Sequence, residues 1–269
     1  MKKDTIILNP IGEVVSDIED KITMPITGQI SAIKVYPEFA DALHLIGENS
    51  HLWILSWFHQ ADRQSLRVAP FRIDRDLPER GVFGLRCFNR PNPIALSLVG
   101  LIKVDGLMLY VSGLDAINGT PVVDIKPYFE QDIVFSPRTP YLRPKDDDMR
   151  REMFFKETEK QHQEDCVWVQ IGISMAMIAD EHFGYLQSPD LRVKVLGPPC
   201  LADIIQGLTR ARFSNPSRFE YKKESKRAEV IWTKKNRALK TRLEKMPDTN
   251  RPISLDEIDD FVIKREIMA

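Results

Sequence analysis

The sequence is poor in cysteine and has no long uninterrupted apolar run. Three cysteines occur among 269 residues, at positions 87, 166 and 200. An odd number of widely spaced cysteines argues against a disulfide framework and is typical of a reducing compartment. No run approaches the roughly 20 apolar residues of a membrane-spanning helix, and the start Met1–Asp4 lacks the apolar stretch of a secretory signal. We therefore expect a cytoplasmic protein without membrane contact.

A surplus of charge is also missing, because 38 lysines and arginines nearly balance 39 acidic residues. With 43% hydrophobic residues, the chain can bury a sizeable core and is long enough for two modest domains. The balance hides a basic segment, since residues 209–245 hold thirteen lysines or arginines against four glutamates, a local charge of 13 − 4 = +9. Such a segment suits a polyanion, and it is equally typical of a solvated helical face with alternating charges.

The first half of the chain consists of short apolar runs separated by Gly, Pro, Asn and Asp. Many short strands with turn residues between them favour a β-sandwich or barrel over alternating βαβ units. The Asp-Gly pair at positions 105 and 106 predicts a hairpin. One helix is expected at residues 38–46. The predicted strands cover residues 5–15, 29–36, 52–59, 81–86, 94–104, 107–113 and 121–125.

A second unit follows the proline-rich stretch 135–148, which has the composition of a linker or a surface connection. Gly184 stands where the C-cap of a helix would lie. The predicted helices cover residues 149–163, 166–182 and 201–208, and the predicted strands cover 191–196 and 228–232. We therefore expect a mainly β domain at residues 1–135, a linker at 136–150 and an α+β accessory domain at 151–269.

Arginine and proline are concentrated in the segment from Arg86 to Ile94. Two prolines around Asn92 fix the backbone and suit a stiff loop that holds Arg86, Arg90 and Asn92 in place. Guanidinium groups bind carboxylate and phosphate through paired hydrogen bonds, so an anionic or polar ligand group is one target. Pairing of these arginines with internal carboxylates is the alternative.

Two further segments carry polar side chains. The turn at residues 118–120 can press its main chain against a ligand, and its threonine adds a hydroxyl. Asp124, Lys126 and Tyr128 alternate along the next strand, so they share one face as a site or as a ladder of salt bridges. The aromatic segment 51–60 ends in a histidine and a glutamine, and on its own it favours a core strand ending in an ordinary histidine.

Together these segments resemble the tRNA N6-threonylcarbamoyladenosine methyltransferase family. The resemblance rests on residues 53–60, Gly81–Phe83 with Arg86, Arg90–Ile94 and Gly119–Tyr128, and covers roughly residues 5–130. It implies a single β-barrel, not a Rossmann sheet, that binds S-adenosylmethionine (AdoMet). It also implies a homodimer with each cofactor site near the subunit interface. The implied reaction methylates N6 of threonylcarbamoyladenosine at position 37 of tRNA, beside the anticodon.

The resemblance also implies which residues contact the cofactor. They lie in an early loop, at a strand end, on the barrel and in the turn before residue 121: Pro25, Ile26, Thr27, His59, Gln60, Arg86, Leu96, Asp115, Ala116, Ile117, Asn118, Gly119 and Thr120. Asn118 departs from the aspartate usual in the family. It keeps an acceptor oxygen but brings no negative charge.

Methyl transfer from AdoMet requires mainly that donor and acceptor be held in line, because the positive sulfur already activates the methyl group. The acceptor nitrogen in the implied substrate belongs to a urea, so a base near its proton would help. We expect Asp124 or Tyr128 to act as that base, with Lys126, Arg90 or Asn92 orienting the modified nucleotide.

The second unit resembles a worn copy of the E-type domain of formylmethanofuran dehydrogenase. Cys166 and Cys200 fit that domain's pattern, and His162 matches its first histidine, whereas Glu164 replaces its second histidine. These four side chains are competent zinc ligands in principle. Half of the pattern is eroded, however, and cysteine is commonly buried without a metal, so we expect no metal.

The basic segment of this unit includes four aromatic residues, Phe213, Phe219, Tyr221 and Trp232. We expect it to contact RNA backbone and to stack on bases, with packing on the barrel or dimer formation as the structural alternative. Three functions stay open for the whole chain. They are methylation of tRNA, methylation of another RNA or of a small metabolite, and AdoMet-binding regulation without catalysis.

Overall fold

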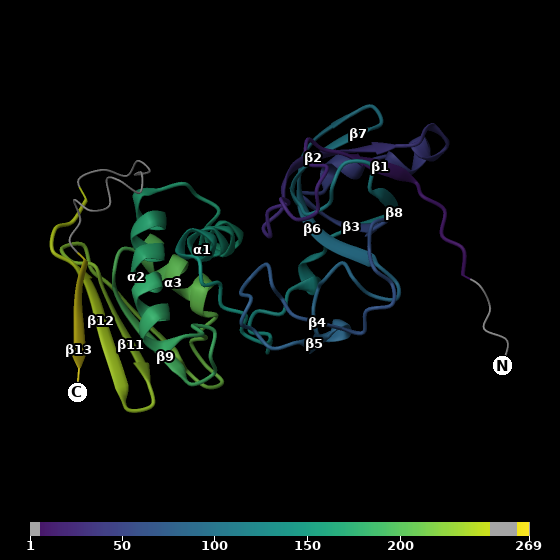
Figure 1. The fold of residues 1–269 in the computed structure, drawn as a ribbon. Coiled ribbons are helices and arrows are strands. Elements are labelled where there is room, and N and C mark those ends of the chain that lie inside the picture. The colour runs from purple at the N-terminus through teal and green to yellow at the C-terminus, as the bar shows by residue number, and fades with distance from the viewer. Residues whose placement is uncertain (1–5, 248–262, 269) are drawn as a thin grey trace. The chain divides into compact units, whose positions relative to one another are not determined.

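The computed structural model describes residues 6–247 and 263–268, and it divides into two compact units, residues 1–133 and 134–269 (Figure 1). The proline-rich stretch falls within the second unit. Among the helices of the described ranges, none combines the length and the apolar composition that crossing a bilayer requires.

Unit 1 is built around a closed barrel of antiparallel strands, which confirms the predicted fold class (Figure 1). Around the barrel, the order is β1-β2-β7-β6-β3-β8. The predicted hairpin is confirmed, because Asp105 pairs with Met108 and Gly106 has a φ of 57°. The strands are β1 (Gly12–Val15), β2 (Gln29–Val35), β3 (His51–Trp57), β6 (Ile94–Asp105), β7 (Met108–Leu114) and β8 (Pro121–Pro127).

The barrel interior is filled by alternate side chains of its strands. Ile33, Ile54, Val99, Leu109 and Val122 are each fully buried in one cluster. Since a small barrel of this kind has no room for a ligand among its core side chains, a binding site has to lie at the rim or on the outer face.

Three predicted elements of unit 1 are wrong in extent or type. The strand expected at 5–15 is limited to β1, and the expected helix is a short 3-10 turn, η1 (Pro37–Leu43). The strand expected at 81–86 is replaced by a two-residue strand and the 3-10 turn η3 (Val82–Gly84). The guanidinium of Arg90 takes up the carbonyls of Val82 and Leu85, so these do not pair with a neighbouring strand. The remaining small elements are β4 (Arg67–Val68), β5 (Arg80–Gly81), η2 (Ile46–Glu48) and η4 (Glu130–Asp132).

Unit 2 is an α+β unit in which three helices cover one face of a five-stranded sheet (Figure 1). The sheet order is β10-β9-β11-β12-β13, with β9 and β10 parallel and the other pairs antiparallel. The predicted helices and two of the strands are confirmed, whereas β10, β12 and β13 were not predicted. The elements are α1 (Asp147–His162), α2 (Val167–Phe183), β9 (Leu191–Gly197), α3 (Pro199–Thr209), β10 (Phe219–Lys223), β11 (Glu229–Lys234), β12 (Arg237–Leu243) and β13 (Ile263–Met268).

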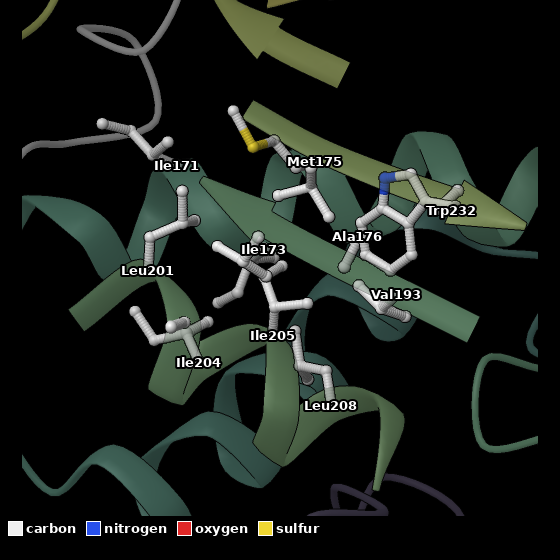
Figure 2. Packing of buried hydrophobic residues seen from close by; sticks show 14 of the residues in the cluster. Ile171, Ile173, Met175, Ala176, Val193, Leu201, Ile204, Ile205, Leu208 and Trp232 are labelled. Atoms are coloured by element: carbon white, nitrogen blue, oxygen red, sulfur yellow. The ribbon is translucent and has the colours of Figure 1, made fainter. Parts of the chain in front are cut away.

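Helices α2 and α3 supply most of the core beneath that sheet. Figure 2 shows Ile171, Ile173 and Met175 of α2 beside Ile204 of α3. A Cβ atom on Gly172 would lie 2.6 Å from Cγ2 of Ile204, so the glycine permits the close approach of the two helices. The core therefore explains Gly172 by packing alone.

The proline-rich stretch is fastened to α2 through one buried carboxylate. Asp180 is 1% exposed and accepts hydrogen bonds from the hydroxyl of Tyr141 at 2.5 Å and from Nε of Arg143 at 2.8 Å. The buried Arg150 of α1 lies 3.5 Å from the same carboxylate. Burial and the hydrogen bond to Asp180 raise the pKa of Tyr141, so its phenol stays protonated as a donor. The stretch is thus an ordered part of unit 2.

We expect Asp180→Asn to lower the unfolding free energy of unit 2 by about 3–5 kcal/mol, because it leaves the guanidinium of Arg150 buried without its charged partner. Glu220→Gln is the matched control, since it removes a carboxylate of the same unit from an exposed ion pair with Lys194 and should cost less than about 1 kcal/mol. Hydrogen exchange of the most protected α2 amides measures both. Equal effects of the two variants would contradict this account of Asp180.

Candidate functional site

A pocket lies at the rim of the barrel, where β3 ends and β8 begins. It encloses about 540 Å³, including solvent at its open mouth. Small-molecule sites commonly have about 300–1,000 Å³. The lining comes from the β1–β2 loop, the end of β3, the long β3–β6 connection and the β7–β8 loop: Lys21, Met24, Phe58, His59, Gln60, Ala61, Arg72, Arg86, Phe88, Asp115, Ile117 and Thr120.

Six of the predicted cofactor contacts meet in this pocket. They come from three separate parts of the chain: His59, Gln60, Arg86, Asp115, Ile117 and Thr120. The barrel brings them together because the end of β3 lies beside the start of β8, where Ser56 pairs with Val122. The other predicted contacts are absent from its lining: Pro25, Ile26, Thr27, Leu96, Ala116, Asn118 and Gly119.

The pocket carries three cations and one carboxylate. Asp115 accepts a hydrogen bond from the hydroxyl of Ser97 and interacts electrostatically with Arg72. Arg72 also donates to the backbone carbonyl of Met24. Burial lowers the pKa of the Arg72 guanidinium and the nearby Asp115 opposes that effect, as expected for a partly desolvated cation beside an anion. With Lys21 and Arg86 added, the pocket has a net positive charge and suits a ligand with an anionic group.

Thr120 presents a polar atom that the protein leaves unsatisfied. Its side chain is 1% exposed, and its Oγ1 has no hydrogen-bond partner among the described residues. A buried hydroxyl without a partner costs free energy, and such groups in pockets are commonly satisfied by a ligand or an ordered water. Arg86 adds an exposed guanidinium at the rim. The pocket therefore offers both a hydroxyl and a charged fork to a ligand.

Asn118 has a structural role in the loop that leads to the pocket. Its Oδ1 accepts from the backbone N–H of Ser16 at 3.2 Å, and its Nδ2 donates to Oε1 of Glu19 at 2.9 Å. An aspartate here would face the Glu19 carboxylate as a like charge and could not donate to it. In this chain, asparagine therefore suits the local hydrogen bonding, and the next residue, Gly119, supplies the positive φ of 70°.

None of the five predicted catalytic residues lines the pocket of the same chain. Arg90 supports η3 through the carbonyls described above, and the backbone carbonyl of Asn92 accepts from Ile94 at 2.8 Å. Asp124 pairs with Lys126 at 2.7 Å, the contact expected of a salt-bridge ladder. Tyr128 follows the far end of β8, where its ring lies 5.8 Å from that of Trp53.

An apolar strip covers the outside of β3 and β6. Core residues of β3 alternate with Trp53, Leu55 and Trp57, which pair with Leu98, Leu96 and Ile94 of β6. The side chain of Leu96 is 47% exposed and that of Ile94 is 36% exposed. We call these six residues the outer strip. On the other side of β3, Leu55 pairs with Asp124 and Trp53 with Lys126, so the polar pair borders the strip.

Sequence reasoning missed half of the pocket lining. Ala61 and Phe88 adjoin predicted residues, and their positions alone could have indicated them. Arg72 had no such signal, because it reaches the pocket only through the fold of the β3–β6 connection. The remaining missed residues are Lys21, Met24 and Phe58.

The basic segment of unit 2 forms part of the core rather than an open aromatic surface. Phe219 is 2% exposed and Trp232 is fully buried, so the prediction that they stack on bases is wrong. Arg218 is also buried and donates to the backbone carbonyls of Ser188 and Leu191. Of the four aromatic residues, Phe213 alone is an exposed side chain.

Comparison with known proteins extends the match beyond the pocket. A "Probable S-adenosyl-L-methionine-binding protein" of Archaeoglobus fulgidus is 33% identical over 221 residues, which are 78% of this chain and 60% of that protein. A protein of the same description from Methanothermobacter thermautotrophicus is 43% identical over 127 residues, 46% of this chain and 90% of that protein. A "tRNA (adenine(37)-N6)-methyltransferase" of Escherichia coli is 39% identical over 132 residues, 44% of this chain and 55% of that protein.

The chain thus spans a little over half of the length of the first and third of these relatives, and nearly the whole of the second. A family model described as the tRNA-methyltransferase O N-terminal domain matches residues 14–132, the part that forms the barrel. The shared barrel, the rim pocket and these matches together show that the chain belongs to the tRNA-methyltransferase O N-terminal domain family.

Proposed function

We propose that this protein is an AdoMet-dependent methyltransferase that modifies N6 of adenosine 37 in tRNA, with the threonylcarbamoyl form of that nucleotide as its substrate. The observation that carries the proposal is the positively charged rim pocket with the unsatisfied hydroxyl of Thr120, in a chain related to AdoMet-binding proteins and to a tRNA methyltransferase. The threonylcarbamoyl group and the homodimer below come from the family resemblance of the sequence.

The pocket residues fit AdoMet by their chemistry. Arg86 and Arg72 offer guanidinium groups to the cofactor's carboxylate, and Asp115 offers a carboxylate to its ammonium or hydroxyl groups. Phe58 and Phe88 offer apolar surface to its adenine. When bound, AdoMet supplies a methyl group activated by a positive sulfur. The contribution of the chain is then to hold the cofactor and to place the acceptor nitrogen in line with it.

Proton removal from the acceptor falls to the polar pair beside the outer strip. The acceptor nitrogen must lose a proton as it gains the methyl group, and an ionised carboxylate at Asp124 can accept that proton. Lys126, 2.7 Å from Asp124, orients the carboxylate. Tyr128 is the second candidate base. Arg90 and Asn92 orient the nucleotide from the proline-braced segment.

A homodimer reconciles the position of these residues with the pocket. Asp124, Lys126 and Leu96 lie on one outer face of three neighbouring strands, whereas the pocket lies at the rim of the same chain. The exposed Leu96 and Ile94 give this face the apolar surface that a second copy would bury. In a two-fold dimer, the outer strip of one protomer then adjoins the pocket of its partner, and each active site contains residues of both chains.

Cofactor binding tests the pocket directly. We expect Arg86→Ala to weaken AdoMet binding by about 10–100-fold, because it removes a charge-assisted hydrogen bond, and Thr120→Val to weaken it by about 10-fold. Lys103→Ala is the matched control for loss of a cation, since Lys103 lies over the ring of Tyr110 and is not a pocket residue. Titration calorimetry with AdoMet measures all three. Wild-type affinity in both pocket variants would reject this pocket as the cofactor site.

Mixing two inactive variants tests the composite site. We expect Asp124→Asn to slow single-turnover methyl transfer without weakening AdoMet binding, and Arg86→Ala to lose activity through binding. If the two residues serve one site from different chains, an exchanged equimolar mixture should recover about a quarter of wild-type activity, because half of the dimers are mixed and each has one intact site. A mixture as inactive as its components would contradict the composite site. Unchanged rates in Asp124→Asn and Tyr128→Phe would reject both candidate bases.

The acceptor is tested with labelled AdoMet. We expect label to enter tRNA that carries threonylcarbamoyladenosine and not the same tRNA without this modification, because the acceptor nitrogen then lacks its urea environment. Label in unmodified tRNA, in another RNA or in a small-molecule fraction would identify a different acceptor. Tight AdoMet binding with no labelled product from total cell extract would favour a regulatory protein.

A further inference from the structure

Three potential metal ligands meet at one end of the helical layer of unit 2. They are His162, the last residue of α1, Cys166, the N-cap of α2, and Cys200, in the first turn of α3. One ligand atom from each lies within 4.8 Å of the other two. His162 Nε2 is 3.3 Å from Cys166 Sγ. A tetrahedral zinc ion, with Zn–S of about 2.3 Å and Zn–N of about 2.0–2.1 Å, needs ligand atoms at such mutual distances.

A neighbouring carboxylate orients the imidazole. Asp203 Oδ2 lies 2.9 Å from His162 Nδ1, and the other oxygen of Asp203 accepts from the side chain of Gln161 at 3.2 Å. Because Nδ1 donates to the carboxylate, the lone pair of Nε2 points to the cysteines. A histidine ligand that donates its other ring nitrogen to a carboxylate is the common arrangement around protein-bound zinc. The side chain of His162 is 6% exposed, so this orientation is fixed by packing.

The two sulfurs are placed where a thiolate is favoured. Both lie at helix N-termini, whose partial positive charge stabilises an anion. Both cysteines are free thiols. Two thiolates also neutralise the charge of a divalent cation, and sulfur with imidazole is the ligand set that zinc prefers over magnesium or calcium.

We propose that His162, Cys166 and Cys200 form a zinc site of unit 2, with Asp203 as the residue that positions the imidazole. The proposal is independent of the function proposed for the rim pocket. It replaces the sequence-based expectation of no metal, because the fold brings together three ligands that the eroded pattern left in doubt. Glu164, the fourth residue of that pattern, is exposed and is not part of the cluster. The fourth tetrahedral position is therefore open to a water molecule or another small ligand.

Metal content of the full chain tests the site. The protein, purified under reducing conditions, is loaded with zinc, dialysed against metal-free buffer and measured by elemental mass spectrometry. We expect one zinc ion per chain in the wild type and loss of that ion in Cys166→Ser and Cys200→Ser. Cys87→Ser is the matched control, because Cys87 is the third free cysteine and lies in unit 1, and it should retain the ion. Wild-type protein without zinc, or the same zinc content in all three variants, would overturn the proposal.

Asp203→Asn guards against variants that lose the metal by misfolding. It keeps all three ligands, and we expect it to bind zinc about 10–100-fold more weakly than the wild type in a chelator competition. Cobalt added to metal-free protein should give an absorption band from sulfur-to-cobalt charge transfer in the wild type and in Cys87→Ser. Absence of that band in the folded wild type, or unchanged zinc affinity in Asp203→Asn, would contradict the assigned ligands and the positioning role.

Discussion

The filled interior of the barrel is the constraint on which the chemistry of unit 1 depends. Side chains such as Ile54 and Val122 close the space between the strands, so no ligand can enter between them. Chemistry is therefore confined to the loops at the rim and to outward side chains. The rim pocket uses the first of these places, and the polar pair Asp124 and Lys126 uses the second.

Local hydrogen bonding explains why the loops of the pocket hold their shape without a ligand. Asn118 fixes the start of the β1–β2 loop through Ser16 and Glu19, and Arg72 fixes a later part of that loop through the carbonyl of Met24. These loops are supported by contacts that do not use the groups offered to the ligand. Thr120 stays unsatisfied because its neighbours in the turn serve the loop. Such preorganisation reduces the free energy that a ligand has to supply on binding.

The sequence predicted the elements whose burial alternates cleanly and missed those that depend on distant partners. Leu52 to Trp57 alternates between core and outer strip, and this pattern was visible in the residue types. Strand β12 was missed because Lys240 and Arg242 look like a solvated segment until Glu266 of β13 is placed beside them. The same limit applies to the pocket. His59 and Arg86 were predicted from motifs, whereas Arg72 depends on how the β3–β6 connection folds.

One pattern in unit 2 has two physical meanings that only the fold separates. Aromatic residues alternating with cations can form an open surface for bases, or a strand with its aromatics in the core and its cations in solvent. Trp232 and Phe219 follow the second arrangement. The cations that remain exposed, among them Lys222 and Lys223, can still attract a polyanion by charge. Any contact of this surface with RNA would then depend on charge more than on stacking, and would weaken steeply with salt while discriminating little between sequences. Choice of the nucleotide would therefore fall to the barrel.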